Sequence, residues 1–204
     1  MLVFGVISPH PPIIIPEIGG AELKKVSQTI EALETSAQQL AAAQPDKIVI
    51  ISPHRQHGYE VPLYYLGKCL TREAELDKIL VTIPSYQYYY ELGKKYGAVI
   101  EQSKERVAII ASADLSHVLK DEGPYGFNPA GPELDASIIK AVRERDVQSL
   151  LSLDREFIEE GAECGLRSIL FLFGVFAGQD YATEVLSYEG PFGIGYMVAT
   201  FTIR

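Results

Sequence analysis

The sequence predicts a single α/β domain with a mainly parallel, mixed sheet flanked by helices. Three short runs of apolar and β-branched residues, at 2–7, 47–52 and 107–112, have the composition of buried strands. A segment without proline or glycine, 21–43, separates the first two runs, and a strand–helix–strand unit implies parallel strands. The 204 residues are enough for one domain, which we expect to span 1–204.

The expected elements follow one another along the whole chain. The segment 21–43 is rich in alanine, leucine, glutamate and glutamine, and it lies between Gly20 and Pro45, which favour the start and the end of a helix. The segment 120–132 contains two Gly-Pro steps and one Asn-Pro step, so it is expected to be a loop. In chain order, we expect strands at 2–7, 47–52, 61–66, 79–83, 107–112 and 193–203, and helices at 21–43, 85–102, 133–151 and 163–177.

Composition and charge argue against several classes of partner. The formal net charge is −9 and the basic residues form no cluster longer than a pair, which disfavours nucleic acid and anionic membrane surfaces. No run of 18 apolar residues occurs, and the apolar amino-terminal stretch lacks the basic start of a signal peptide. Two cysteines are too few for a disulfide framework. We therefore expect a cytoplasmic protein with reduced thiols.

Three of the four histidines follow a predicted parallel strand. His10, His54 and His117 each come a few residues after one of the three apolar runs. The carboxyl ends of parallel strands lie at one edge of a sheet, and ligands bind there in open α/β folds. We therefore expect these three histidines to converge in one cleft. The alternative is that each is an ordinary turn residue.

A metal ion is the ligand that such a cluster suggests. Two imidazoles and one carboxylate form the arrangement of non-haem iron(II) oxygenases, and the same set with a water serves catalytic zinc. Glu163 is the candidate carboxylate, because the very apolar helix 166–177 would carry it into the interior, where a charge needs a partner. Two alternatives stay open. The negative charge of Glu163 interacts favourably with the helix dipole at the amino terminus, or Glu163 pairs with Arg167.

The motifs around these residues resemble the class III extradiol ring-cleavage dioxygenase superfamily, of the protocatechuate 4,5-dioxygenase catalytic-subunit type. Within it the chain is most similar to the Memo-like, or AmmeMemoRadiSam, branch. The matching segments occur in the expected order over nearly the whole chain. They are SPHPPIIIPEIG at 8–19, IISPHRQHG at 50–58, ASADLSH at 111–117, PYGFNPAGPELD at 124–135 and GAECGLRSILFLFG at 161–174.

The resemblance implies a role for each matching residue. His10, His54 and Glu163 would be the ligands of iron(II), with zinc as the alternative metal, and His117 would be the acid–base catalyst. Memo-type proteins can present a cysteine where the dioxygenases have the glutamate, so the choice between Glu163 and Cys164 stays open. Further residues expected around these ligands are Asp114, Cys164, Arg167 and His57. His57 is not part of the family pattern, and a surface position is the alternative for it.

The resemblance also implies the fold of a class III extradiol dioxygenase catalytic subunit and an oxidoreductase activity. The substrates would be a small catechol-type aromatic molecule, whose ring is opened, and dioxygen. A homo-oligomer is expected by the same analogy. Two other functions remain alternatives: a zinc-dependent hydrolase with the same site, and a non-enzymatic, Memo-like metal or redox adaptor that binds a partner protein.

Overall fold

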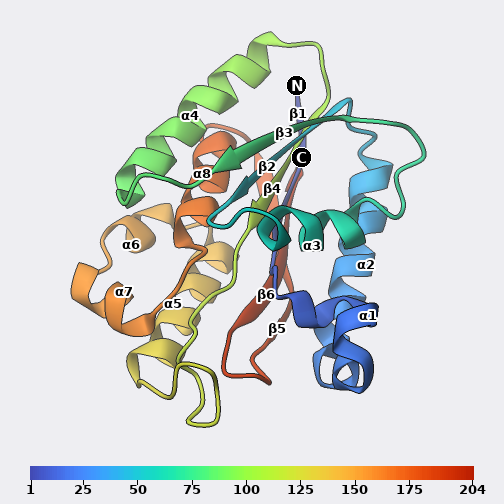
Figure 1. The fold of residues 1–204 in the computed structure, drawn as a ribbon. Helices are drawn as coiled ribbons and strands as arrows, with labels where there is room; N and C mark the ends of the chain where they lie inside the picture. Colours follow the sequence, from blue (N-terminus) through green and yellow to red (C-terminus); the bar gives the residue numbers. More distant parts are fainter.

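Four strands form the parallel part of a six-stranded mixed sheet, which lies between two layers of helices (Figure 1). The computed structural model describes all of residues 1–204. The strand order is β3-β2-β4-β1-β6-β5, with β5 and β6 antiparallel to their neighbours. The strands are β1 (Leu2–Ser8), β2 (Lys47–Ser52), β3 (Glu75–Leu80), β4 (Val107–Ser112), β5 (Tyr181–Glu189) and β6 (Tyr196–Ile203).

The helices divide between the two faces of the sheet because buried strands present apolar side chains on both sides. Ile48 and Ile50 of β2 pack with α2 and α3, whereas Val49 and Ile51 belong to the larger core formed with α4, α5 and α8. The helices are η1 (Pro12–Ile14), α1 (Pro16–Gly19), η2 (Gly20–Val26), α2 (Ser27–Ala42), α3 (His57–Leu66), α4 (Tyr86–Gln102), α5 (Ala130–Glu144), α6 (Val147–Leu151), α7 (Arg155–Gly161) and α8 (Leu166–Phe176).

Three neighbouring strands end in register at a serine. Ser8 of β1 pairs with Ser112 of β4, and Ile51 pairs with Ala111, which puts Ser52 of β2 level with Ser112. All three serines are completely buried. The segments that leave these strands therefore start from the same level at the carboxyl edge of the sheet.

Helix α8 is apolar on nearly every side and is buried against the sheet and α4. Two glycines let the α4 and α8 backbones touch. A Cβ on Gly93 would lie 2.1 Å from the Phe171 carbonyl oxygen, and one on Gly174 would lie 2.2 Å from the Tyr90 carbonyl oxygen. This contact holds the carboxyl-terminal half of α8 against α4.

Most of the expected elements are confirmed, including the strands at 2–7, 47–52 and 107–112. The predicted strand at 61–66 is wrong, since these residues form the second half of α3. A proline inside a helix leaves one carbonyl without its amide donor. Here that carbonyl belongs to Gly58, four residues before Pro62, and it accepts a hydrogen bond from Ser112 Oγ instead.

Other boundaries differ from the expected ones. The strand expected at 79–83 lies earlier, as β3. The helix expected at 133–151 is two helices, because Arg145 adopts a left-handed conformation (φ 58°) that ends α5. The helix expected at 21–43 begins with a 3₁₀ segment. Strand β5 and helix α7 were not expected. No helix is both long and apolar enough to traverse a lipid bilayer.

Candidate metal centre

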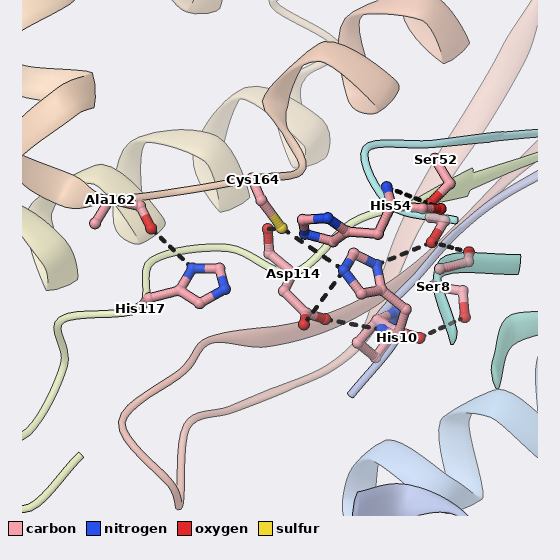
Figure 2. Close-up of polar contacts among 11 residues, drawn as sticks. Ser8, His10, Ser52, His54, Asp114, His117, Ala162 and Cys164 are labelled. Carbon is pink, nitrogen blue, oxygen red and sulfur yellow. Dashed lines mark hydrogen bonds and ion pairs between the residues drawn. The ribbon is translucent and has the colours of Figure 1, made fainter. Parts of the chain in front are cut away.

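Side chains from three distant segments bring their ligand atoms together at the carboxyl edge of the sheet (Figure 2). His10 follows β1, His54 follows β2 and Cys164 precedes α8. One nitrogen from each imidazole and the Cys164 sulfur all lie within 4.8 Å of one another. The Nε2 of His10 is 3.7 Å from Sγ of Cys164. Two imidazoles and a thiolate are a donor set used by zinc and other borderline or soft metals.

Strand register explains why the two histidines meet. His10, His54 and Asp114 each lie two residues beyond one of the three aligned serines. The strand order β2-β4-β1 therefore places Asp114 between the two histidines along the sheet edge. The repeated spacing is visible in the sequence as SPH, SPH and SAD.

A hydrogen-bond relay fixes the proton of His10. Its Nδ1 lies 2.9 Å from Ser112 Oγ, and the same Oγ lies 2.5 Å from the Gly58 carbonyl oxygen. A carbonyl only accepts, so the Ser112 hydroxyl donates to Gly58 and accepts from Nδ1–H of His10. The Nε2 atom then carries the lone pair, and it is this atom that faces Cys164. Sequence reasoning missed Ser112, although it repeats the spacing of the other two serines.

Asp114 supplies a buried carboxylate next to the imidazoles. Its Oδ1 accepts a hydrogen bond from the His10 amide at 2.8 Å, and its Oδ2 lies 3.6 Å from His10 Nε2. Burial raises the pKa of Asp114 to about 6, while its hydrogen bond from His10 and the nearby histidines lower it. The carboxylate thus fixes the backbone of one histidine and places negative charge where a cation would lie.

The protonation of the three candidate ligands fits a metal ion. Burial, followed by the neighbouring histidines, lowers the pKa of His10 well below its ordinary value, and burial also lowers that of His54. Both imidazoles are therefore held neutral, the form that binds metals. Burial raises the pKa of the Cys164 thiol well above its ordinary value. A cation at this point would reverse that effect, because it stabilises the thiolate.

His117 lies beside this group and is not part of it. Its Nδ1 lies 2.7 Å from the Ala162 carbonyl oxygen, so Nδ1 carries the proton and donates it. Its Nε2 is left without a partner and is on the side of the ring that faces Asp114 and Cys164 (Figure 2). The ring of Tyr125, 65% exposed, contacts the His117 ring edge-on at 5.4 Å between centroids.

The fourth histidine joins the same cluster. His57 begins α3, and its ring centroid lies 5.8 Å from that of His10 and 5.4 Å from that of His54. His10, His54 and His57 therefore surround one point at the sheet edge, and His117 lies beside it. The structure brings together every expected histidine, as well as Asp114 and Cys164.

Glu163 is not brought into this group. Its fully buried carboxylate accepts hydrogen bonds from the Tyr86 hydroxyl, at 3.1 Å, and from the Leu166 amide at the start of α8. Arg167 Nη2 lies 3.8 Å from its Oε1. Burial raises the pKa of Glu163, and these partners oppose the shift. The Glu163 carboxylate therefore has protein partners, at the start of α8 and in Arg167, and needs no metal to compensate its burial. Cys164 supplies the third donor atom beside the nitrogens of His10 and His54.

Most of this chain matches a known protein family. Residues 55–199 match the family described as the catalytic LigB subunit of aromatic ring-opening dioxygenase. The matched region contains Asp114, His117 and Cys164. His54 immediately precedes this region, and His10 lies further upstream.

Two individual proteins are similar to this chain. Protein CA_C1420 of Clostridium acetobutylicum is 28% identical over 259 residues, covering 93% of this chain and 55% of the relative, so the chain spans about half the length of that protein. The crystal structure of the uncharacterized protein JW3007 from Escherichia coli K12 has a TM-score of 0.52 at 12% identity, covering 97% of this chain and 99% of that chain, which supports the fold. Since the family match extends over more than half of its residues, the chain belongs to the family of catalytic subunits of aromatic ring-opening dioxygenases.

Proposed function

We propose that this protein is a metal-dependent oxidoreductase that opens the ring of a catechol-type aromatic substrate with dioxygen. The observation that carries the proposal is the convergence of the His10, His54 and Cys164 ligand atoms beside the free Nε2 of His117. Membership of the ring-opening dioxygenase family supports the same reaction class. The metal would be held by these three side chains, with iron(II) as the ion that suits oxygen chemistry.

The two neutral imidazoles and Cys164 would hold the ion on one side. A bound iron(II) ion would supply the open positions at which a catechol and dioxygen meet in fixed geometry. Three protein ligands leave such positions free. The Ser112 relay would keep the His10 lone pair directed at a bound ion, and the Asp114 carboxylate would offset part of the charge of the ion.

His117 would be the acid–base residue. The Ala162 carbonyl holds its Nδ1–H, so Nε2 can take a proton from a substrate hydroxyl and later return it during ring opening. The exposed ring of Tyr125 beside His117 offers an aromatic surface against which a substrate ring can pack.

One observation favours a second candidate, a zinc-dependent hydrolase. A thiolate ligand is common in zinc sites, whereas a carboxylate is the usual partner of two histidines in iron(II) oxygenases. In that reaction His117 would take a proton from a water molecule at the site and pass it to the leaving group.

Metal analysis and oxygen uptake separate the two candidates. Protein purified without added metal is analysed for iron and zinc, loaded anaerobically with iron(II), and mixed with a panel of catechols and air. Ring opening predicts oxygen consumption together with a new visible absorbance. His117→Ala should keep the metal and lose turnover, while His10→Ala should lose the metal. Full zinc occupancy, with no oxygen uptake from any catechol after iron loading, would instead support the hydrolase.

A further inference from the structure

A cavity lies beside the amino-terminal end of α8. It is a cavity of about 680 Å³ between the start of α4, helix α7 and the turn that leads into α8. This volume is in the range of small-molecule sites. None of the four histidines, Asp114 or Cys164 lines it. The cavity is therefore separate from the group of side chains used in the proposed function.

Arg167 lines this cavity and lacks a hydrogen-bond partner for a buried nitrogen. Its Nε is inaccessible to solvent and has no acceptor, and the Glu163 Oε1 at 3.8 Å from Nη2 is too distant for a hydrogen bond. The side chain is 23% exposed, so water reaches only part of it. The Nη atoms also make no hydrogen bond to the protein, and they, rather than the inaccessible Nε, are the donors that a ligand in the cavity can reach.

The other charged groups of the cavity already have partners. Arg155 Nε lies 2.8 Å from Glu159 Oε1, and both of these side chains are exposed at the rim. Glu163 also lines the cavity, but its fully buried carboxylate accepts hydrogen bonds from the Tyr86 hydroxyl and from the Leu166 amide at the start of α8. Arg167 is thus the cation of the cavity that makes no hydrogen bond to a carboxylate, since its ion pair with Glu163 spans 3.8 Å.

We propose that this cavity binds a small molecule with a carboxylate group and an apolar or aromatic body, and that Arg167 is its anchor. The planar guanidinium matches a carboxylate with two parallel hydrogen bonds. Its face is already covered by the Tyr86 ring, at 5.1 Å from the ring centroid, which leaves the nitrogen-bearing edge for the ligand. Pro84 and Ile158 supply apolar surface for the rest of the molecule.

One stretch of backbone forms a wall shared by this cavity and the metal centre. Ala162 and Glu163 line the cavity, while the Ala162 carbonyl holds His117 and the next side chain, Cys164, faces His10. A molecule bound at Arg167 therefore contacts the segment that positions both groups. The inference goes beyond the proposed function and does not depend on it, because ligand binding is measured without turnover.

The test is a titration of the purified chain of residues 1–204 with benzoate, phenylacetate and isovalerate, followed by calorimetry and by the Arg167 Nε–H signal in NMR spectra. Benzamide is the uncharged control, and inorganic phosphate separates a carboxylate site from a general anion site. Arg167→Gln removes the anchor. Arg143→Gln, on the surface of α5, is the matched control, and His54→Ala tests whether the probe binds a metal instead. Circular dichroism checks that each variant is folded.

We expect at least one carboxylate to bind and to shift the Arg167 Nε–H signal. Arg167→Gln should weaken binding by about 10-fold or more, whereas Arg143→Gln and His54→Ala should leave it unchanged. No binding of any carboxylate, an unshifted Arg167 signal, equal binding of benzamide or phosphate, or loss of binding in His54→Ala would each overturn the assignment. If Arg167→Gln does not fold, the NMR signal of the wild-type protein still decides the question.

Discussion

The Ser112 hydroxyl and the His10 Nδ1 lie 2.9 Å apart, and Pro62 sets the direction of the hydrogen bond between them. Because Pro62 has no amide proton, the Gly58 carbonyl is free to accept from Ser112. Ser112 then has only its lone pairs to offer His10, which must carry its proton on Nδ1. A residue of α3 thus decides which nitrogen of His10 faces the metal site.

Ser112→Ala should therefore weaken metal binding without removing a ligand. His10 would lose the acceptor that fixes its tautomer, and such supporting partners typically contribute about 10- to 100-fold in metal affinity. A competition titration with a chromogenic chelator measures the change. Ser8→Ala is the matched control, since Ser8 ends the adjacent strand in register but donates only to the Pro9 carbonyl. Equal affinities in the two variants would contradict the relay.

Substitution of Cys164 should remove bound metal, whereas substitution of Glu163 should not. Cys164→Ser should lose most of the metal, because the sulfur belongs to the group of donor atoms. Glu163→Gln should keep the metal and lower the free energy of unfolding by about 1–3 kcal/mol, since the amide cannot satisfy both Tyr86 and Leu166 as the carboxylate does. Elemental analysis and denaturant unfolding measure the two quantities. Metal loss in Glu163→Gln alone would make Glu163 the third ligand.

The stability of the fold should depend on the ionisation of Asp135. This carboxylate is 1% exposed and accepts hydrogen bonds from the Ser116 amide at 2.8 Å and the Tyr188 hydroxyl at 2.6 Å. Burial raises its pKa from 3.8 to about 6, so the folded state binds its proton more tightly than the unfolded state. Its contribution to stability is therefore full below about pH 4 and is lost as the pH rises through 6.

Asp135→Asn should remove this pH dependence. The free energy of unfolding of the wild type, relative to this variant, should fall between pH 4 and pH 7 by at most about 3 kcal/mol, at roughly 1.4 kcal/mol per pKa unit. Tyr188→Phe, which keeps Asp135, should make the free energy of unfolding fall more steeply with pH, because the Tyr188 hydrogen bond lowers the pKa of Asp135. Urea unfolding at the two pH values checks both. Parallel curves for wild type and Asp135→Asn would show that the carboxylate is not perturbed.

The contact between α4 and α8 should make Gly93→Ala destabilising, although alanine is ordinarily more favourable than glycine inside a helix. Alanine in place of glycine inside a helix ordinarily stabilises by about 1 kcal/mol. At Gly93 the added Cβ meets the Phe171 carbonyl oxygen at 2.1 Å, so the helices must separate, at a cost of about 1–3 kcal/mol or more. Gly97→Ala, where the nearest atom is 2.7 Å away, should cost less. Thermal melting gives the order, and the reverse order would refute the argument.

Local patterns in the sequence were sufficient to predict the parallel strands and the gathering of the histidines. Runs such as 47–52 and 107–112 are apolar on both faces, and His54 and His117 follow them within a few residues. Strand ends in a parallel sheet share one edge, so the clustering of the histidines follows from these local signals alone. The segment 61–66 was misassigned because six apolar residues fit a buried strand or a buried helix equally well.

The third donor could not be predicted from the chain around it. Glu163 and Cys164 are adjacent, and which of them faces the histidines depends on distant partners. Tyr86 of α4 takes the carboxylate, and a bridge between Ser116 and Glu163 sets the direction of the backbone. Neither contact leaves a signal in residues 161–167. The Ser112–Gly58 hydrogen bond was invisible for the same reason, since it joins groups 54 residues apart.

The order of strands at the sheet edge has a consequence for the size of side chain that the site tolerates. Adjacent strands are spaced about 4.8 Å apart, so the backbones that carry His10 and His54 stand roughly 10 Å from each other. Two imidazoles reach across that gap from either side, and an ion fits between their tips only if the strand in the middle contributes a short residue. Asp114 meets this condition, whereas a bulky side chain there would fill the volume that the cation needs.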